Sequence, residues 1–162
     1  MNLIAAVDNE WGIGNNGDLL IRIGDDLQEF KRLTMYKTIV LGRKTLSTFP
    51  RGEALKNRTN IILSHNADFK PDNALVYNSL QPLLDELKKY NSKDIFVVGG
   101  ESVYNLMLPY CDTAYITKID MSFEKDSWIP NLDIDSNWSI VDVGDERESE
   151  GVRYHFTKYQ RN

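Results

Sequence analysis

The sequence predicts an α/β fold built on a mostly parallel β-sheet, and three observations support this prediction. Short, uninterrupted apolar runs such as residues 3–7 and 95–98 are typical of strands buried on both faces of a sheet. Amphipathic segments of helical period alternate with these runs, which implies parallel strands joined by right-handed crossovers. Beyond Cys111 only strand patterns remain, and their alternation predicts an antiparallel margin.

The expected elements follow one another without a linker or an internal repeat. Residues 25–33 carry apolar side chains at helical spacing, acids in the first turn and bases near the end, which complements the helix macrodipole. A Gly- and Asn-rich segment, 11–18, precedes this helix and is predicted to be a loop. The remaining strands are expected at 38–41, 60–64, 74–77, 113–119, 138–143 and 152–159. The remaining helices are expected from residue 43, at 79–89 and at 103–109.

Length, charge and cysteine content narrow the class of protein. The chain has 162 residues, the length of one domain, which excludes a dehydrogenase with separate cofactor and substrate domains. A formal net charge of −5 disfavours nucleic acid and anionic membranes as partners unless a local basic patch exists. Cys111 is the single cysteine, and residues 1–8 lack the features of a signal peptide or membrane span. We therefore expect a cytoplasmic protein with no nucleic-acid or membrane partner.

One glycine pattern resembles a known fingerprint without its structural context. Gly12-Ile13-Gly14-Asn15-Asn16-Gly17 matches the G-x-G-x-x-G spacing of dinucleotide-binding proteins and follows a predicted strand. In that fingerprint the last glycine opens a helix whose N-terminus meets pyrophosphate, whereas here residues 18–24 separate Gly17 from the helix signal at Asp25. We interpret the segment as a flexible loop over a site.

Two other glycine turns stand where a strand gives way to a helix. At Gly99-Gly100 and at Gly42-Arg43-Lys44-Thr45, backbone N–H groups can approach an anion closely. An ordinary tight turn explains the Gly99-Gly100 pair equally well. Ligands bind at the carboxyl ends of parallel strands. Two phosphate sites on different strands of one sheet would suit a dinucleotide.

The titratable residues give few signals on their own. Asp26 begins a helix, where the macrodipole favours an acid, so the pattern alone favours a structural role over ligand binding or proton handling. His65 and His155 lack partners at the spacing of a metal site or a hydrolytic triad, so no metal is expected. The three tryptophans are interpreted as packing residues because no basic residues are interleaved with them.

Taken together, these segments resemble the dihydrofolate reductase family in order and spacing over nearly the whole chain. The motifs that carry the resemblance are Leu3-Ile4-Ala5-Ala6, Ile13-Gly14, Asp26-Leu27-x-x-Phe30-Lys31-x-x-Thr34, Leu41-Gly42-Arg43-Lys44-Thr45, Asn57-Arg58-x-Asn60-Ile61-Ile62-Leu63-Ser64, Val97-Val98-Gly99-Gly100-x-x-Val103-Tyr104 and Tyr115-Ile116-Thr117-x-Ile119. The resemblance implies a doubly wound α/β fold, with an eight-stranded, mostly parallel sheet flanked by helices and an antiparallel C-terminal strand. It also implies a single domain over residues 1–162, with an adenosine-binding lobe at about 37–90.

The same resemblance implies an NADPH-dependent reduction of 7,8-dihydrofolate to tetrahydrofolate, in which a hydride reaches pterin C6 while N5 gains a proton. Asp26 is then the catalytic residue, which anchors the pterin and promotes protonation of N5 through water, and this replaces its structural interpretation. The pterin would also meet Thr117 and the main chain at Ile4 and Val98. The rest of the substrate would be bound by Leu27, Phe30, Phe49 and Leu55, with Arg58 on its glutamate α-carboxylate.

For the cofactor, the resemblance implies three groups of residues. The nicotinamide would lie against Ala6 and beneath a lid that includes Ile13, Gly14, Asp18 and Leu19. The adenosine ribose and its phosphates would be bound by Gly42, Arg43, Lys44, Thr45, Leu63, Ser64 and His65. The pyrophosphate and nicotinamide ribose would be bound by Gly99, Gly100, Glu101, Ser102, Val103 and Tyr104, with a cis peptide between the two glycines.

Two positions depart from the family pattern. Leu19-Leu20-Ile21-Arg22-Ile23-Gly24 lacks both prolines and the tryptophan of the usual Leu-Pro-Trp-x-Leu-Pro, and that tryptophan helps to hold a water near the pterin. His65 stands near the cofactor's 2′-phosphate, where many members have Ser or Arg, and it binds phosphate better when protonated. These departures affect proton delivery, lid motion and the preference for NADPH over NADH.

Two other functions are compatible with parts of the pattern. A reductase of another pterin, or of a pyrimidine precursor of riboflavin, would share the fold, but Asp26 and Arg58 together favour folate. A module that binds folate or a dinucleotide without turnover is compatible with the altered segment 19–24. We expect an enzyme that acts as a monomer on a small-molecule substrate, dihydrofolate.

Overall fold

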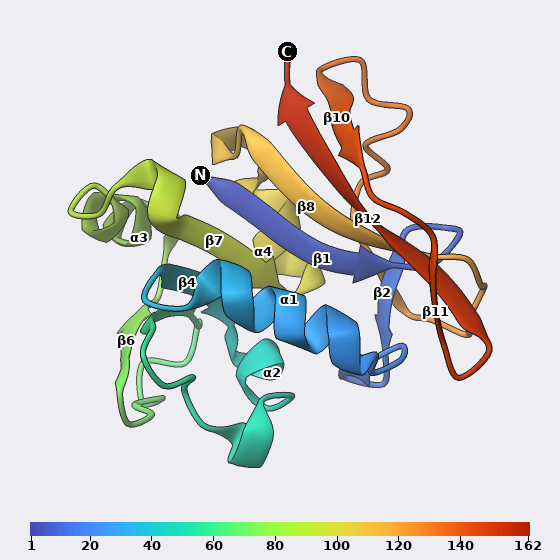
Figure 1. The fold of residues 1–162 in the computed structure, drawn as a ribbon. Coiled ribbons are helices and arrows are strands. Elements are labelled where there is room, and N and C mark those ends of the chain that lie inside the picture. Colours follow the sequence, from blue (N-terminus) through green and yellow to red (C-terminus); the bar gives the residue numbers. More distant parts are fainter.

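In a computed structural model, which describes residues 1–162, helices cover both faces of a twisted β-sheet (Figure 1). Eight strands follow the order β10-β12-β8-β1-β7-β4-β5-β6, and β11 also pairs with β12. The strands are β1 (Asn2–Val7), β4 (Thr38–Gly42), β5 (Thr59–Leu63), β6 (Ala74–Tyr77), β7 (Ile95–Gly99), β8 (Thr113–Ile119), β10 (Trp138–Val143), β11 (Arg147–Ser149) and β12 (Val152–Arg161). The helices are α1 (Gly24–Thr34), α2 (Arg43–Leu46), α3 (Leu80–Leu87) and α4 (Glu101–Met107), with 3₁₀ turns at Pro50–Gly52, Ser92–Asp94 and Leu108–Tyr110.

The strand pairing confirms the predicted mixed sheet. β1 pairs in parallel with β7 and β8, and β4 pairs in parallel with β5 and β7. β12 runs antiparallel to both β8 and β10, so the predicted antiparallel margin lies at the C-terminal edge.

None of the helices is long and apolar enough to cross a membrane.

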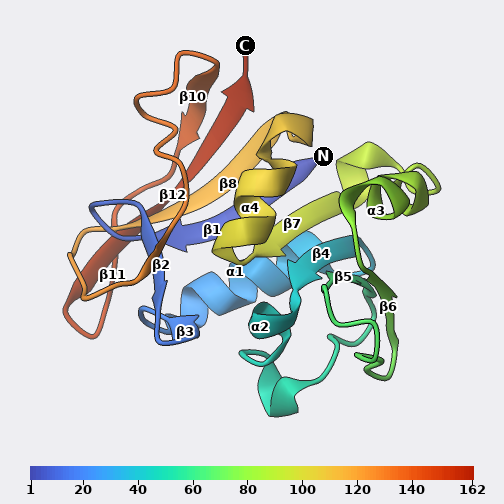
Figure 2. The same ribbon diagram turned by 180° about the vertical axis from the view of Figure 1, so that it is seen from behind.

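Alternate residues of the central strands pack on opposite faces of the sheet. Val40 and Val97 belong to the larger core, which also contains side chains of α3 and α4. The preceding residues, Ile39 and Phe96, belong to the smaller core, against which Phe30 of α1 packs. Figures 1 and 2 show α1 on one face of the sheet and α4 on the other. This alternation explains why the strands are continuous apolar runs in the sequence.

The segment 11–18, predicted to be a loop, instead forms part of a second sheet. β2 (Gly12–Asn15) pairs antiparallel with β3 (Asp18–Leu19) and with β9 (Ser127–Trp128). The loop prediction is wrong because β2 pairs with β9, which lies far along the sequence. No pattern within residues 11–18 indicates this pairing. The glycine pattern is followed by β3 and not by a helix, which confirms that it is no dinucleotide-binding fingerprint.

Two of the three tryptophans are packing residues, as predicted. Trp11 and Trp138 are buried in the larger core. Trp128 is 42% exposed, so the packing interpretation is wrong for this residue. The reason is its place in β9, a short edge strand that has only β2 beside it.

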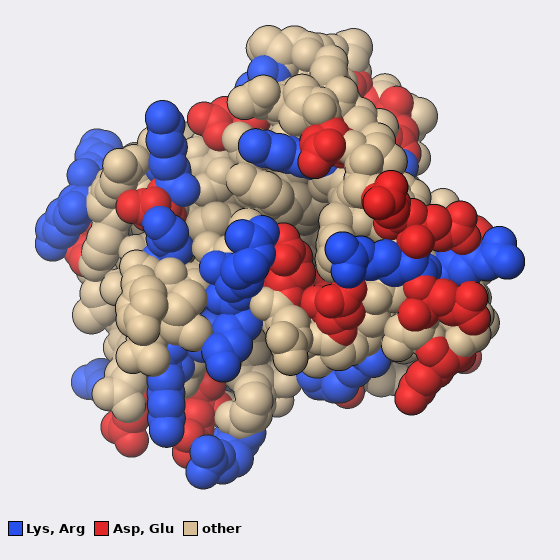
Figure 3. All heavy atoms as spheres, viewed as in Figure 1, with Lys and Arg blue, Asp and Glu red and all other residues tan.

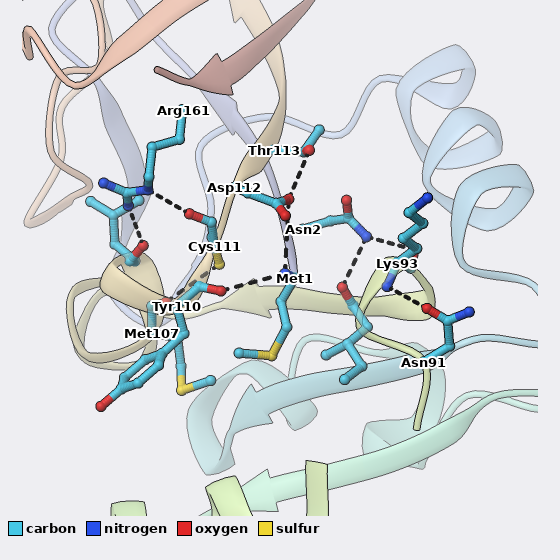
Figure 4. A network of polar contacts seen from close by, with 12 residues as sticks. Met1, Asn2, Asn91, Lys93, Met107, Tyr110, Cys111, Asp112, Thr113 and Arg161 are labelled. Atoms are coloured by element: carbon cyan, nitrogen blue, oxygen red, sulfur yellow. Dashed lines mark hydrogen bonds and ion pairs between the residues drawn. The ribbon is translucent and has the colours of Figure 1, made fainter. Parts of the chain in front are cut away.

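A network of polar contacts fixes the start of β1 against its neighbours (Figure 4). The buried side chain of Asn2 donates to the carbonyls of Lys93 and Ile95, at 2.9 and 3.1 Å. Arg161, at the end of β12, donates to two carbonyls at the 3₁₀ turn that follows α4, at 2.7 and 2.8 Å. The Asn2 bonds hold the start of β1 against the start of β7, and the Arg161 bonds hold the end of β12 against the turn after α4.

Candidate functional site

A carboxyl group in the first turn of α1 meets a hydroxyl group on β8. Thr117 Oγ1 donates a hydrogen bond to Asp26 Oδ1 at 2.5 Å. Thr117 is paired with Ala6 across β8 and β1, so this contact brings the start of α1 to the central strands. The neighbouring acid, Asp25, is tied elsewhere, to Arg147 at 2.9 Å. Asp25 also accepts from the Tyr154 hydroxyl of β12 at 2.9 Å, so only Asp26 contacts the central strands.

Burial raises the pKa of the Asp26 carboxyl above its usual range. The hydrogen bond from Thr117 opposes this rise without cancelling it, and the charges of Asp25 and Glu29 raise the pKa further. No lysine, arginine or histidine pairs with Asp26. A partly buried acid with a raised pKa can take up or release a proton closer to neutral pH than an ordinary aspartate can.

Three predicted pterin contacts lie on the adjacent strands β7, β1 and β8. Leu3 of β1 is paired with Val97 of β7, so the next residues along the two strands, Ile4 and Val98, are neighbours. Tyr104 of α4 donates its hydroxyl to the Ile4 carbonyl at 2.6 Å, and burial raises the pKa of this phenol, so it stays protonated. The Ile4 carbonyl keeps a second lone pair for a ligand.

Apolar side chains around these strands are left partly uncovered. Phe30, Phe49, Leu55 and Val98 all pack against the smaller core, yet each remains partly exposed. Leu27, one residue after the catalytic candidate, is 39% exposed although its spacing predicts the same helix face as Phe30. Partly exposed apolar side chains beside a few polar groups are typical of a small-molecule site.

Arg58 lies beside the last turn of α1 without an acidic partner. Its guanidinium donates to Thr34 Oγ1 at 3.3 Å and to the Lys56 carbonyl at 2.9 Å. Partial burial lowers its pKa, and no carboxylate of the protein lies close enough to form an ion pair. A guanidinium held in this way keeps N–H donors for a carboxylate or phosphate ligand.

One residue that sequence reasoning left without a role fixes the loop that carries Leu55 and Arg58. Asn60 is buried in β5, and its Nδ2 donates to the carbonyls of Leu55 and Arg58 at 2.9 and 3.0 Å. Its Oδ1 accepts from the Leu55 N–H at 3.0 Å. A polar residue inside an otherwise apolar strand is the sequence signal that could have revealed it.

The two glycine turns predicted to bind phosphate lie against each other. A Cβ atom at Gly42 would stand 3.2 Å from Val103 and 3.9 Å from the Gly100 nitrogen. A Cβ atom at Gly99 would stand 3.2 Å from the Thr45 hydroxyl, and Gly99 has a φ of +132° that side chains rarely tolerate. The peptide between Gly99 and Gly100 is cis, as the resemblance implies. The ends of β4 and β7 thus form one surface.

Basic side chains gather at the ends of β4 and β5. Gly42 is paired with Leu63, so the residues that follow them begin two neighbouring loops. The side chains of Arg43, Lys44 and His65 are exposed there, and none forms an ion pair or hydrogen bond within the protein. Figure 3 shows mostly Lys and Arg among the charged side chains on the half of this face that holds β4 and β6, whereas around β11 many Asp and Glu side chains are mixed with Lys and Arg. An acidic chain therefore carries a local positive region.

The predicted lid is tied to the loop that precedes β9. Asp8, buried at the end of β1, pairs with Lys125 Nζ at 2.7 Å and accepts from the Gly12 N–H at 2.9 Å. A Cβ atom at Gly12 would stand 2.0 Å from Lys125 Cδ, so the lysine stem lies directly on the β2 backbone. Asp126 Oδ2 accepts from the Asn16 N–H at 3.0 Å. These contacts order a segment that its composition predicts to be flexible.

The segment 19–24, which departs from the family pattern, makes contacts of its own. Ile21, at the position of the missing tryptophan, packs with Ala6 against a small cluster that contains Ile23. Arg22 pairs with Asp18 at 2.9 Å and donates to the Thr48 carbonyl at 3.3 Å. Apolar packing and an ion pair thus hold the segment without the two prolines.

Four further residues predicted to bind the cofactor are exposed, and two of them are bonded within the protein. Asp18 is already engaged by Arg22, and Leu19 beside it is 42% exposed. Glu101 accepts a 3.4 Å hydrogen bond from the Trp128 N–H, and Ser102 is exposed on α4. Four of the remaining cofactor candidates, Ile13, Leu63, Val103 and Tyr104, pack in or against the larger core. Gly14 lies in β2, Thr45 lies in α2, and Ser64 follows β5 directly.

A family model described as dihydrofolate reductase matches residues 1–161. The chain is 34% identical over 163 residues to the dihydrofolate reductase of Staphylococcus haemolyticus, and the match covers 99% of this chain and 95% of that protein. The enzyme of the same name from Bacillus subtilis (strain 168) is also 34% identical over 163 residues, covering 99% and 94%.

A solved structure of a dihydrofolate reductase from Enterococcus faecalis, complexed with NADP(H) and RAB-propyl, is similar to this one. The TM-score is 0.86, the sequence identity is 33%, and the match covers 99% of this chain and 95% of that chain. Family model, relatives and solved structure agree over almost the full length. This chain belongs to the dihydrofolate reductase family.

Proposed function

We propose that the chain reduces 7,8-dihydrofolate to 5,6,7,8-tetrahydrofolate with NADPH, with Asp26 as the residue that controls the proton, so that it supplies tetrahydrofolate for one-carbon metabolism. Family membership supports the reaction. The observation that supports the role of Asp26 is its position: a partly buried carboxyl with a raised pKa and a single hydroxyl partner, between α1 and the central strands. Such a group is costly to bury unless a ligand uses it.

The reduction adds one hydride and one proton across a carbon–nitrogen double bond. NADPH, when bound, supplies the hydride that reaches pterin C6. Asp26 binds the edge of the pterin and promotes protonation of N5, either directly or through water, and Thr117 fixes the orientation of its carboxyl group. The carbonyls of Ile4 and Val98 accept hydrogen bonds from the same ring, and they define its plane against the sheet.

The rest of the substrate is bound between α1 and the loop after α2. Leu27, Phe30, Phe49 and Leu55 enclose its apolar middle, and Arg58 pairs with the glutamate α-carboxylate. The support for this assignment is the spacing along α1: Asp26 lies in the first turn of the helix, whereas Arg58 contacts Thr34, its last residue. The helix thus separates the acidic and basic contacts by its full length, as an elongated ligand with a pterin at one end and a carboxylate at the other requires.

The residues present fit a dinucleotide that carries an additional phosphate. Arg43, Lys44 and His65 have no counter-charge in the protein, and the backbone at Gly42, Gly99 and Gly100 has no side chain to block an approach. We assign the adenosine ribose phosphates to Arg43, Lys44 and His65. Thr45, Leu63 and Ser64 lie beside these basic residues. The pyrophosphate and nicotinamide ribose lie along the glycine-rich backbone, from Gly99 to Tyr104. Ala6, Ile13, Gly14, Asp18 and Leu19 enclose the nicotinamide.

The chain is proposed to work as one domain, with residues 37–90 as the lobe that binds adenosine. A cytoplasmic location is supported by the cysteine content, because Cys111 is the single cysteine and no internal disulfide can form. We propose that the chain acts as a monomer. The net charge of −5 argues against a nucleic-acid partner.

The fall in nicotinamide absorbance after dihydrofolate is added to protein and NADPH tests the proposal. We expect steady turnover with NADPH and slower turnover with NADH, because only NADPH carries the phosphate that the basic side chains bind. Binding of both ligands without any loss of absorbance would identify a module without activity. Turnover of another pterin, or of a pyrimidine precursor of riboflavin, in preference to dihydrofolate would also contradict the proposal.

Asn60→Leu is expected to raise KM for dihydrofolate by about tenfold, an effect of ~1.4 kcal/mol, and to leave kcat nearly unchanged. The substitution removes three hydrogen bonds that hold the backbone of Leu55 and Arg58, whereas Asp26 and Thr117 are untouched. Steady-state kinetics with varied dihydrofolate measures both constants. Asn78→Ala, which removes one amide bond to the Ser64 carbonyl in the cofactor lobe, is the matched control. A fall in kcat with unchanged KM would contradict this role of Asn60.

A further inference from the structure

We propose that Phe69 is a positioning residue that strengthens the preference for NADPH over NADH by holding the guanidinium of Arg43 over its ring. The inference rests on the proposed assignment of Arg43 to the 2′-phosphate of the cofactor. It adds a residue outside the phosphate contacts, in the loop between β5 and β6, and it assigns that residue a role in selectivity.

The contact between the two side chains is a cation–π stack. The Arg43 Cζ atom lies 4.7 Å from the centroid of the Phe69 ring, well inside the range of such interactions. No carboxylate, carbonyl or hydroxyl group of the protein binds the Arg43 side chain. The contact with the ring therefore orders the guanidinium, while its N–H groups, which have no partner in the protein, stay free to bind an anion.

Phe69 can act as a platform because its own position is fixed. One side of the ring packs against the smaller core, and the residue is only partly exposed. The turn that leads to it is closed by hydrogen bonds from the Phe69 N–H to the Asn66 carbonyl at 3.1 Å and from the Asp68 N–H to Asn66 Oδ1 at 3.0 Å. Asn66 is in turn bonded to Ser64 Oγ at 3.2 Å, directly after β5. The ring is thus attached to the sheet.

The stack matters for the phosphate and not for the rest of the nucleotide. A guanidinium binds a phosphate best when two parallel N–H groups face two oxygens, and this geometry depends on the orientation of the plane. An exposed arginine without the ring loses more conformational freedom when it binds the anion. NADH has a ribose hydroxyl at the same place and no charge, so the orientation of Arg43 contributes little to its affinity.

Calorimetric titration of Phe69→Leu with adenosine 2′,5′-bisphosphate and with 5′-AMP tests the inference. Leucine keeps the packing on the core side and removes the aromatic face. We expect the Kd for the bisphosphate to rise about three- to tenfold, the range of an exposed to partly desolvated cation–π contact. The Kd for 5′-AMP should stay within about twofold of that of the wild type. In steady-state kinetics KM for NADPH should rise by the same factor, with KM for NADH, KM for dihydrofolate and kcat unchanged.

Two further variants complete the experiment. Phe69→Tyr retains the aromatic face and should keep the wild-type Kd for the bisphosphate. Leu75→Ala, on β6 in the same lobe, removes an apolar side chain that is 43% exposed and should also leave the Kd unchanged. Equal weakening of the bisphosphate and of 5′-AMP in Phe69→Leu would mean that the ring contacts the adenosine itself or shapes the lobe, and this would overturn the inference. Unchanged affinity for both ligands would overturn it as well.

Arg43→Leu separates this inference from the proposed function. If Arg43→Leu keeps the wild-type affinity for the bisphosphate, the assignment of Arg43 to the 2′-phosphate is wrong and the inference is lost with it. If Arg43→Leu weakens the bisphosphate and Phe69→Leu does not, the assignment stands and only the role of Phe69 is wrong. When both act, the double variant should bind the bisphosphate no more weakly than Arg43→Leu alone, because the ring works through the guanidinium.

Discussion

Asp26→Asn is expected to lower kcat at neutral pH by about 10²-fold or more, the scale of a positioned proton-handling group. Asparagine has the same shape and can still accept the hydrogen bond from Thr117, but its amide cannot release a proton. Steady-state turnover with both substrates saturating measures the effect. Asp25→Asn is the matched control, because this neighbouring acid is bound to Arg147 and Tyr154 and not to Thr117. Unchanged turnover in Asp26→Asn would contradict the assigned role.

The same substitution is expected to stabilise the folded protein at neutral pH. Burial raises the pKa of Asp26, so the folded protein binds this proton more tightly than the unfolded chain, where the pKa is near 3.8. Wild-type stability therefore declines as the pH rises from that value through the raised pKa, and Asp26→Asn lacks this decline. Urea unfolding at about pH 4 and about pH 8 should show that the stability advantage of the variant grows with pH. A difference that is the same at both pH values would contradict the burial of a titrating carboxyl group.

Arg58→Leu is expected to raise KM for dihydrofolate by about 10²-fold, because truncating one partner of a hydrogen-bonded charge pair has effects of this size. We expect kcat at saturating substrate to change little, since Arg58 contacts the last residue of α1 and Asp26 lies in its first turn. Steady-state kinetics with varied dihydrofolate measures both constants. Equal affinity of wild type and variant for dihydrofolate would refute the assignment.

A shortened substrate makes the test of Arg58 specific. A dihydropterin without the glutamate portion has no α-carboxylate, so wild type and Arg58→Leu should bind it with the same affinity. Lys56→Met serves as the control, because Lys56 is an exposed cation in the same loop. If the variant also binds the shortened pterin more weakly, the effect of Arg58 comes from the loop structure and not from the carboxylate.

The main sheet could be predicted from the sequence because its burial pattern is local. Strands such as β4 and β7 are covered on both faces, so each is a continuous apolar run that ends at a glycine, Gly42 or Gly99. Helix α1 has acids in its first turn and bases in its last, and these signals lie within one segment of the sequence. Strands buried on both faces and amphipathic helices can both be recognised within a short segment of sequence.

The second sheet could not be predicted because its contacts are long-range. β2 contains glycines and asparagine, which carry no strand signal, and it is ordered by β9 near the other end of the chain. The Lys125 side chain that lies on Gly12 and pairs with Asp8 is equally remote in sequence. No pattern within the segment 11–18 indicates that it contacts β9 and Lys125, so its composition alone predicts a loop.

The candidate site shows the same limit. Local reasoning favours a structural role for Asp26, since any acid in the first turn of a helix is favoured by the macrodipole. The raised pKa and the bond to Thr117 depend on a residue 91 positions away. The resemblance to a family corrected the interpretation of Asp26, but it did not identify Asn60 or Phe69, whose proposed roles depend on contacts with Leu55, Arg58 and Arg43.

The pH dependence of the hydride-transfer step tests the central claim, the control of the N5 proton by Asp26, most directly. Single-turnover rates with NADPH already bound report this step alone. The wild-type rate should be constant at low pH and fall about tenfold per pH unit above the raised pKa of Asp26, where the carboxyl group has lost its proton. In Asp26→Asn only solvent protons remain, so the rate should keep rising as the pH falls, without a plateau. A plateau with the same midpoint in both proteins would contradict the account.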